Sequence, residues 1–277
     1  MKLSDARILL TGAAGGLGAA AATRLARGGA SVLLSDRDPA ALQRLADRLR
    51  EKGSRVAWLA GDVTSAEDRQ RLAGHASQWQ GGINVLVNNA GLNDFALLGD
   101  QPEARIEAML RVNVLAPILL TRSLLPWLSG LAEAHVLNVG STFGSIGYPG
   151  YAPYSATKFA LRGFTEAMRR EHADGPVRFH YLAPRAAKTA LNSAAVNAMN
   201  EALGVQMDPP ERVADALAAI IEGNRPEAYL GWPERLFVRI NALFPRLVDA
   251  SLKKQLPTIK HYAAGPGPDA AKGGTPA

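Results

Sequence analysis

The sequence predicts an α/β domain in which a parallel sheet of about seven strands is covered by helices on both faces. Short apolar runs alternate with helix-like stretches through most of the 277 residues, and these runs are continuous in Val, Leu and Ile. A strand covered on both faces needs apolar side chains on both sides, which is typical of parallel sheets. Repetition of strand and helix along one chain then indicates a doubly wound sheet.

The expected strands lie at residues 7–10, 31–35, 56–60, 85–88, 135–139, 178–183 and 227–230. Segments rich in Ala, Leu and Arg at helical spacing separate them, for example 17–27 and 39–52. Hydrophobic residues make up 47% of the chain, enough for one large domain. We assign residues 1–231 to this domain and 232–262 to an amphipathic helical extension of it. Residues 263–277, mostly Gly, Pro, Ala and Lys, are expected to be a disordered tail.

Composition excludes several classes of function. The chain has no cysteine, so disulfides, thiolate metal ligands and a cysteine nucleophile are absent, and no metal site is expected. No apolar run approaches the ~20 residues of a membrane span. The N-terminal residues are too few and too polar for a secretory signal, so a cytoplasmic location is the default expectation.

The net charge of +6 comes from 31 basic and 25 acidic residues, and the excess is local. Residues 234–260 hold six Lys or Arg against two acids, whereas the first two hundred residues interleave the signs. A nucleic-acid-binding protein usually gathers its basic residues into one stripe on its fold. We therefore expect no nucleic-acid partner.

A glycine-rich loop, TGAAGGLG at residues 11–18, follows the first expected strand and precedes a helix. Glycines let the backbone turn sharply and approach a pyrophosphate, whose charge sits at the helix N-terminus. A glycine-rich turn of any α/β protein is the alternative. In a Rossmann-type unit, the residues facing the cofactor phosphates would be Gly12, Gly15, Gly16, Leu17 and Gly18.

Asp36 stands at the end of the second expected strand, 24 residues after Gly12. An acid at this place bonds the adenosine ribose hydroxyls and repels a 2′-phosphate, so Asp36 favours NAD. Arg37 follows directly, and arginine is the natural partner of a 2′-phosphate. NADP therefore stays open as the second choice of cofactor.

Further motifs appear in a fixed order: Asp62-Val63, NNAG at residues 88–91, Asn113, Ser141, and YSATK at residues 154–158. Ser141 precedes Tyr154 by 13 residues. Together with the TGxxxGxG loop, these motifs resemble the short-chain dehydrogenase/reductase family, in its common shorter branch, over roughly residues 5–231. YxxxK alone occurs often by chance, whereas the ordered set with this spacing is specific.

The resemblance implies a site for NAD or NADP. Ser141 would hold the substrate carbonyl or hydroxyl, Lys158 would grip the nicotinamide ribose, and Asn113 would hold a water that links Lys158 to solvent. The other contacts implied for the cofactor are Asp62 and Val63 at the adenine, Asn89, Ala90 and Gly91 along the adenosine ribose, and Tyr154 and Thr189 at the nicotinamide.

Tyr154 is the expected proton donor and acceptor. It lies four residues before Lys158, so the two side chains share one helix face. A phenol with a pKa near ~10 is a poor base at neutral pH. A neighbouring lysine cation and the positive charge of the oxidised nicotinamide are expected to lower that pKa. Tyr151 has Ser155 four residues later in place of a lysine, so we expect it to be pocket wall or core.

One segment departs from the family pattern, which usually has Pro-Gly after the sixth strand. Here Pro184 and Thr189 are kept, but Arg185 occupies the place of the glycine. Its φ must therefore suit a residue with a side chain. Arg185 is either solvated or an anchor for an anionic group of the substrate.

We therefore expect hydride transfer between a nicotinamide cofactor and a secondary alcohol/ketone pair. Apolar residues in the loop 186–207 (Leu191, Val196, Met199, Leu203 and Met207) suggest a lipophilic substrate. The alternatives are a reductase of carrier-bound 3-oxoacyl chains and a non-catalytic nicotinamide-binding regulator. By resemblance, we expect a homodimer or homotetramer paired through residues 102–129 and 154–173.

Residues 232–260 lie beyond the resemblance. Wound as a helix, they have one broad apolar face with arginines beside it, and Pro245 is expected to break or kink the helix. Three roles stay open for this segment: packing on its own domain or a partner subunit, capping a pocket for a long lipophilic substrate, or peripheral contact with an anionic membrane.

Overall fold

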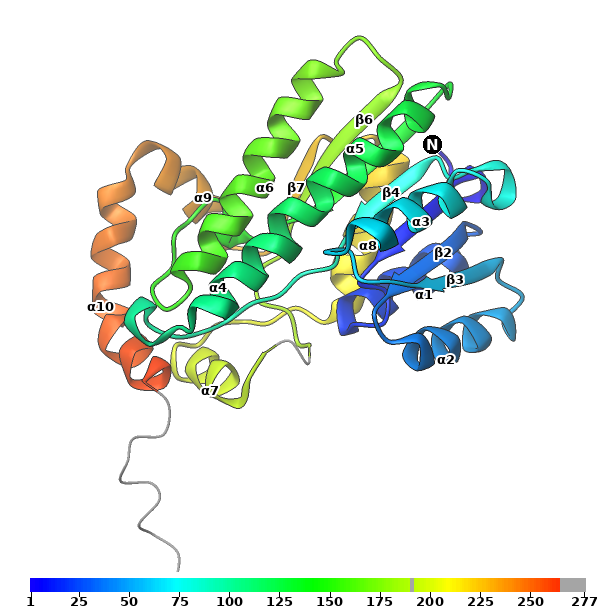
Figure 1. Ribbon diagram of the computed structural model, residues 1–277. Coiled ribbons are helices and arrows are strands. Elements are labelled where there is room, and N and C mark those ends of the chain that lie inside the picture. The colour runs from blue at the N-terminus through cyan, green and yellow to red at the C-terminus, as the bar shows by residue number, and fades with distance from the viewer. Residues whose placement is uncertain (190–191, 265–277) are drawn as a thin grey trace, which may run out of the picture.

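The computed structural model describes residues 1–189 and 192–264, and its centre is the expected parallel sheet (Figure 1). Seven strands lie in the order β3-β2-β1-β4-β5-β6-β7. They are β1 (Arg7–Thr11), β2 (Ser31–Asp36), β3 (Val56–Ala60), β4 (Val85–Asn88), β5 (Ala134–Val139), β6 (Val177–Ala183) and β7 (Glu227–Tyr229). The predicted Rossmann-type fold is confirmed, and each strand end lies within one residue of its expected position.

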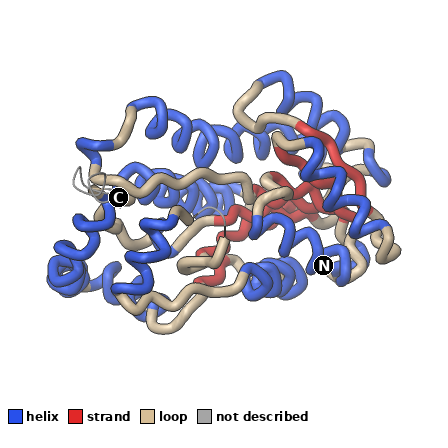
Figure 2. Tube along the Cα trace, turned by 90° about the horizontal axis from the view of Figure 1, so that it is seen from below, coloured by secondary structure: helices blue, strands red, loops and turns tan. Residues whose placement is uncertain are grey.

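Helices cover both faces of the sheet (Figure 2). They are α1 (Gly16–Arg27), α2 (Pro39–Arg50), α3 (Ala66–Ala76), α4 (Glu103–Leu110), α5 (Ala116–Ser129), α6 (Ala152–Glu171), α7 (Ala194–Ala202), α8 (Pro210–Gly223), α9 (Glu234–Leu243) and α10 (Pro245–Ala263). Alternate residues of β1 enter separate cores: Ile8 and Leu10 pack with α1, α2 and α8, whereas Leu9 packs with α3 and α5. This is why the strands are continuous in apolar residues.

The strand order creates a crevice at the carboxyl edge of the sheet. β1 pairs with β2 on one side and with β4 on the other, so the direction of winding reverses between them. Ligands of open α/β sheets bind at such a switch point. Thr11, the last residue of β1, holds the loop after β4, because its Oγ1 accepts hydrogen bonds from the backbone N–H groups of Asn89 (3.1 Å) and Ala90 (3.2 Å).

One helical segment differs from the expectation that no stretch is long and apolar enough to span a membrane. By length and composition alone, Glu103–Ser129 passes that test, with a mean hydropathy of 1.4 over its most apolar window, of which 39% is buried. In the fold, α5 lies on the sheet and buries Leu120, Leu124 and Leu128 in the core beneath it. Core helices pass this test as well, and these buried leucines of α5 belong to such a core.

At the amino end of β5 and β6, two buried histidines form a hydrogen-bonded pair. His135 Nδ1 lies 2.8 Å from His180 Nε2, and His180 Nδ1 lies 2.7 Å from the carbonyl oxygen of Arg225. Because a carbonyl only accepts, His180 donates from Nδ1 and its Nε2 accepts from His135. Burial is the main reason that the pKa of His180 falls to about 4.

The chain beyond β7 forms an arm of two helices, α9 and α10, at the end of the molecule far from β3 (Figure 1). The helix breaks between Leu243 and Pro245, as predicted. α10 packs against α7, and Val238 of α9 with Val248 and Ile259 of α10 supply the arm's larger buried side chains. Ala263, placed at the start of the expected tail, is the last residue of α10, and residues 265–277 lie outside the described part of the chain.

Candidate active site

The glycine-rich loop has the geometry that a phosphate site needs. Gly12 has a φ of +64°, and a Cβ there would lie 2.7 Å from the Cα of Ala90. A Cβ on Gly18 would clash with the carbonyl oxygen of Gly12. These two positions therefore require glycine. Gly15 is the N-cap of α1, so the free amides of the helix start face the crevice beyond β1.

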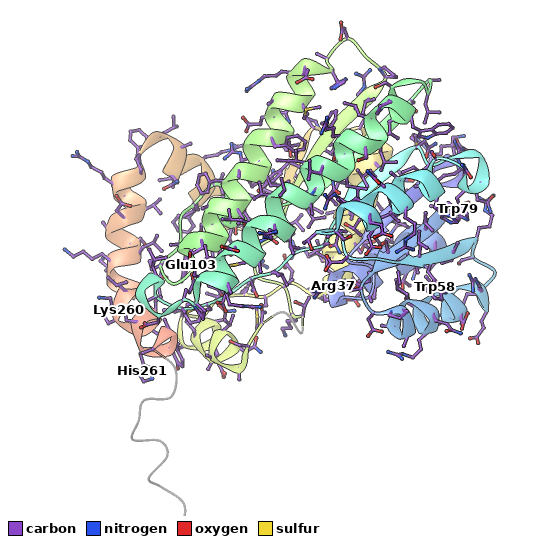
Figure 3. The ribbon with its side chains drawn as sticks, viewed as in Figure 1. Arg37, Trp58, Trp79, Glu103, Lys260 and His261 are labelled. Carbon is purple, nitrogen blue, oxygen red and sulfur yellow. The ribbon has the colours of Figure 1, made fainter. Side chains whose placement is uncertain are left out.

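Asp36 lies at the end of β2 with its carboxylate fixed by two backbone amides. Its Oδ2 accepts a hydrogen bond from Ala14 N (3.0 Å) and its Oδ1 accepts one from Arg37 N (2.7 Å). The carboxylate is thus held against the glycine-rich loop, whereas the Arg37 side chain is exposed, near the middle of the molecule in the view of Figure 3. A fixed negative charge here disfavours a second negative charge nearby.

Asp62 and Asn89 have additional roles that their motifs did not indicate. The Asp62 carboxylate accepts hydrogen bonds from the N–H (2.8 Å) and hydroxyl (2.7 Å) of Thr64. The Asn89 amide donates to the carbonyl oxygens of Thr11 and Gly12, both at 3.0 Å. Asn89 therefore ties the loop after β4 to the loop after β1. Sequence reasoning missed Thr11, although its place before Gly12 at a strand end was the available signal.

Asn113 lies in a π-helical turn, Arg111–Leu115, between α4 and α5. Its Oδ1 accepts from Leu92 N (2.8 Å), and its Nδ2 donates to Leu92 O (2.7 Å) and to the hydroxyl of Thr157 (3.0 Å). The side chain is buried and behind the crevice wall. It braces α6, which bears Tyr154 and Lys158, and the water expected at Asn113 stays a prediction.

Ser141, Tyr154 and Lys158 meet at the carboxyl edge of β5. Lys158 is buried, its Nζ donates to the carbonyl oxygen of Val139 (3.0 Å), and the same nitrogen lies 5.6 Å from the centre of the Tyr154 ring. Ser141 Oγ accepts a hydrogen bond from Phe143 N (3.1 Å), which fixes the hydroxyl in the turn. The serine, the phenol and the ammonium group therefore form one cluster.

In the protein by itself the pKa of Tyr154 is raised, and the lowering expected with the oxidised nicotinamide bound stays a prediction. Burial raises the pKa of Tyr154 to about 12, and a hydrogen bond with Ser141 opposes only part of this rise. Burial also lowers the pKa of Lys158 to about 8. Both shifts have one cause, because a low-dielectric site disfavours whichever form carries charge.

A single cavity of about 870 Å³ joins these elements. It is lined by all of the predicted catalytic and cofactor-binding residues except Asn113. Those lining residues are Gly12, Gly15, Gly16, Leu17, Gly18, Asp36, Arg37, Asp62, Val63, Asn89, Ala90, Gly91, Ser141, Tyr154, Lys158 and Thr189. Tyr154 lies where the glycine-rich half of the cavity meets a second, apolar half.

The apolar half is built by segments far apart in the chain. Tyr151 is buried and lines it, as expected, and the rings of Phe143 and Tyr148 are tilted against it at 5.3 Å and 6.3 Å between ring centres. α7 contributes Val196 and Met199, and Leu203 follows. Met207 is outside the lining, and Leu191 lies outside the described residues.

Sequence reasoning did not assign the arm's contribution to this wall. The lining residues from the arm and the segment before it are Trp232, Pro233, Glu234, Phe237, Val248, Ser251, Leu252 and Gln255. Tyr148 donates a hydrogen bond to Gln255 Oε1 (3.3 Å), which joins α10 to the loop before α6. The amphipathic pattern was the available signal, but it did not say which of three surfaces the helices cover.

Arg185 is neither solvated nor free to anchor a substrate anion. Its φ is not positive, as expected, but its side chain is buried. The guanidinium pairs with Asp208 (2.8 Å) and with Glu234 of α9 (3.3 Å). The hydrogen bond with Asp208 is the main reason that the pKa of Arg185 rises. Arg185 therefore links β6, the segment before α8, and the arm.

Comparison with known proteins agrees with this geometry. The family model described as "short chain dehydrogenase" matches residues 6–200. Among curated proteins, the uncharacterized oxidoreductase YxnA of Bacillus subtilis is 32% identical over 94% of this chain and 75% of its own. Dehydrogenase/reductase SDR family member 4 of Homo sapiens is 34% identical over 69% of each chain.

Solved structures show the same relationship. A short-chain dehydrogenase/reductase from Burkholderia phymatum in complex with NAD has a TM-score of 0.80 at 26% identity, covering 89% of this chain and 96% of that one. The 3-ketoacyl-(acyl-carrier-protein) reductase from Brucella melitensis complexed with NADH has a TM-score of 0.73 at 30% identity, covering 79% and 91%. From fold, site and these matches together, the chain belongs to the short-chain dehydrogenase/reductase family of oxidoreductases.

Proposed function

We propose that the protein transfers hydride between NAD or NADP and a secondary alcohol/ketone pair with apolar substituents, with Tyr154 as general acid and base. The observation that carries the proposal is the position of Tyr154. It stands between the glycine-rich and the apolar halves of one cavity, beside Ser141 and Lys158. A reacting carbonyl held there can meet a proton donor and a hydride donor at once.

The glycine-rich half fits a dinucleotide. Gly12 and Gly18 permit the close backbone packing that shapes the loop, and the start of α1 offers free amides to a pyrophosphate. The residues that would hold the cofactor are those of the loop, Asp36, Asp62, Asn89 and Thr189, with Lys158 at the nicotinamide ribose. When bound, the nicotinamide would supply or accept the hydride.

In the direction of reduction, Ser141 holds the carbonyl oxygen by its hydroxyl. The Tyr154 hydroxyl gives its proton to that oxygen as hydride reaches the carbonyl carbon, so the product is a neutral alcohol. In the direction of oxidation, the phenolate of Tyr154 takes the proton back. The high pKa of Tyr154 supports the acid role, because the phenol is protonated at neutral pH. Lys158 in its charged form stabilises the phenolate left behind.

NAD is the favoured cofactor. The Asp36 carboxylate is held by Ala14 and Arg37 amides at the place where an adenosine ribose would lie, and it would repel a 2′-phosphate. Arg37, exposed beside it, keeps NADP as the second choice. The structural relatives include complexes with NAD, with NADH and with 5-hydroxy-NADP, and they support both.

We also propose a surface for the pairing of subunits and a cellular location. Leu110, Leu115 and Phe159, on the segments expected to pair two subunits, are large apolar side chains exposed on the described chain. Their exposure supports a homodimer or homotetramer built on the face formed by α4, the π-helical turn, α5 and α6. The cytoplasmic location expected from the sequence stays part of this proposal.

A screen separates the candidate activities. Purified protein is mixed with NADH or NADPH and either secondary ketones of increasing apolar size or 3-oxoacyl thioesters on a carrier protein, and cofactor absorbance is followed. Oxidation of NADH with free apolar ketones supports the proposal. Turnover confined to carrier-bound thioesters would favour the 3-oxoacyl reductase, to which the Brucella melitensis relative points. Cofactor binding without turnover of any substrate would favour a regulator.

A further inference from the structure

The arm formed by α9 and α10 exposes a concentration of large apolar side chains. Six of the ten such side chains exposed on the described residues lie between residues 232 and 247. We name the surface formed by Trp232, Leu236, Phe237, Leu243, Phe244 and Leu247 the apolar elbow. Trp232 is 72% and Leu243 is 74% exposed. Soluble domains seldom expose large apolar residues in such a cluster unless it has a partner.

The exposed charges beside the elbow are mostly positive, with Asp249 as the one exposed acid among residues 234–260. Residues 234–260 contain six basic and two acidic side chains, and one of the acids, Glu234, is turned toward Arg185. Within residues 1–189 and 192–264, none of the six basic side chains forms an ion pair, and all are exposed. These are Arg235, Arg239, Arg246, Lys253, Lys254 and Lys260.

Three of these cations share one side of α10. Arg246, Lys253 and Lys260 are spaced by seven residues, which is two helical turns, so they form a stripe along the helix. Figure 3 shows Lys260 on the arm, at the end of the molecule opposite to Trp58 and Trp79. Val248 and Ile259, on the other side of α10, are buried against the body. The basic stripe therefore faces away from the protein.

Charge complementarity indicates which partner binds the apolar elbow and the basic residues beside it. A second copy of the chain would set the same cations against each other, which opposes self-docking. An anionic phospholipid surface attracts basic residues, and its boundary between headgroups and acyl chains accepts Leu, Phe and Trp side chains. Apolar residues flanked by unpaired cations on an amphipathic helix pair fit such a surface.

The elbow is continuous with the cavity. Trp232 and Phe237 belong both to the exposed elbow and to the lining of the apolar half, and Val248 and Leu252 line the same half from the inner side of α10. A lipophilic molecule dissolved in a bilayer under the elbow would thus meet apolar side chains from the surface to the neighbourhood of Tyr154.

We propose that the arm docks on an anionic phospholipid bilayer through the apolar elbow and the basic residues beside it, and that the site draws its lipophilic alcohol or ketone from that bilayer. The second part rests on the function proposed above, whereas the first part does not. Docking is peripheral, because the two helices of the arm also form a wall of the site and, among the described residues, only Glu103–Ser129 passes the test for a membrane span.

Vesicle flotation tests the docking with the full-length protein. The wild type is expected to float with vesicles of phosphatidylcholine and phosphatidylserine at low salt, to be released by added salt, and not to float with phosphatidylcholine alone. Leu243→Ser combined with Phe244→Ser should abolish flotation. Leu98→Ser, a similarly exposed leucine outside the arm, is the matched control and should float as the wild type does.

A further pair of double variants tests the contribution of the basic residues to vesicle binding. Lys253→Glu with Lys260→Glu should weaken binding by roughly fivefold or more for each basic residue removed. Arg44→Glu with Arg48→Glu, two exposed arginines of α2, makes the same change of charge elsewhere and should bind nearly as well as the wild type. Thermal unfolding of each variant shows whether the fold is intact.

Several results would overturn the docking: no flotation of wild type with anionic vesicles at low salt, equal loss in the matched controls, or self-association through the elbow in place of flotation.

Activity assays distinguish a failure of the docking proposal from a failure of the proposed function. Turnover of a bilayer-partitioned ketone should rise on addition of anionic vesicles, and turnover of a water-soluble ketone should not. Flotation without turnover of either ketone rejects the proposed function alone, and turnover without flotation rejects the docking alone.

Discussion

The two halves of the cavity are built in different ways. The glycine-rich half is made by residues that directly follow β1, β2, β3 and β4, so each lies at the carboxyl edge of the sheet by the strand register. The apolar half depends on α7 and on the arm, which reach it from beyond β6 and β7. The first half is held by hydrogen bonds between loops that follow neighbouring strands, and the second by side-chain contacts of helices that follow β6 and β7. Substitutions in the glycine-rich half should therefore leave the preference among ketones unchanged. Substitutions in the apolar half should leave the preference between NADH and NADPH unchanged.

The largest expected effect is at Tyr154, where the halves meet. Tyr154→Phe keeps the ring and removes the hydroxyl, so turnover should fall by ~10²–10⁴ while NADH binding is retained, because general acid–base groups are typically worth that much. Steady-state rates and NADH fluorescence titration measure the two quantities. Tyr151→Phe, a buried neighbour in the same wall, is the control and should change turnover far less. A Tyr154→Phe enzyme within a few-fold of the wild type would contradict the assignment.

Substitution of Arg185 tests how the apolar half of the cavity is attached to β6. Arg185→Ala leaves the buried Asp208 carboxylate without its main partner, so the free energy of unfolding should fall by about 3 kcal/mol or more. KM for a bulky ketone should rise more than KM for a small one, while KM for NADH stays near its wild-type value. Arg212→Ala removes a more exposed partner of Asp208 and should cost under about 1 kcal/mol. Equal effects of the two variants would show that Arg185 does not hold the wall.

Acid should destabilise both halves of the cavity together, because both are attached to the same sheet. The pKa of His180 is about 4 in the folded protein and near ~6.5 in the unfolded chain, so between these values the unfolded state binds more protons. The free energy of unfolding should therefore fall as pH drops from about 6.5 toward 4, by up to roughly 3 kcal/mol. Denaturant unfolding at several pH values measures this slope.

Two variants separate the protonation of His180 from other effects of acid on the free energy of unfolding. His180→Asn cannot gain a proton at this position and should flatten the slope, even if it lowers stability at every pH. His75→Asn, on the surface of α3, should keep the slope of the wild type. A slope unchanged by His180→Asn would assign acid sensitivity to other groups.

The smallest expected effect is on cofactor choice. Asp36→Ala removes the carboxylate that would repel a 2′-phosphate and frees Arg37 to pair with it, so the ratio of kcat/KM for NADPH over NADH should rise by about tenfold, which corresponds to ~1.4 kcal/mol. The preference among ketones should not change. A wild type that already strongly prefers NADPH would show that Arg37 dominates over Asp36.

Much of the fold and of the glycine-rich half could be predicted from the sequence, because their determinants are local. Gly12 and Gly18 are required by contacts within one loop, and Tyr154 and Lys158 share a helix face by spacing alone. Each strand carries its apolar run within five or so residues. In these cases the physical cause and the sequence pattern lie in the same short segment.

The rest could not be predicted because its causes are distant in the chain. Arg185 pairs with residues 23 and 49 positions away, so no local pattern indicated that it would be buried. The raised pKa of Tyr154 in the protein alone could not be predicted, because burial, its main cause, is not visible in a YxxxK spacing. The amphipathic pattern of the arm was clear, but its packing beside α7 depends on the whole fold.

The chain order of these segments has a consequence for how such proteins can diversify. α7 and the arm follow β6, whereas the glycine-rich loop, Ser141, Tyr154 and Lys158 precede it. Substitution, insertion or recombination downstream of Pro184 can therefore remodel the substrate wall with the upstream machinery left in place. Arg185 opens this portion and Gly231 directly precedes its arm, and the two are closely packed, since a Cβ on Gly231 would meet the Arg185 side chain. A graft of the downstream portion onto a related sheet would need to carry both residues together.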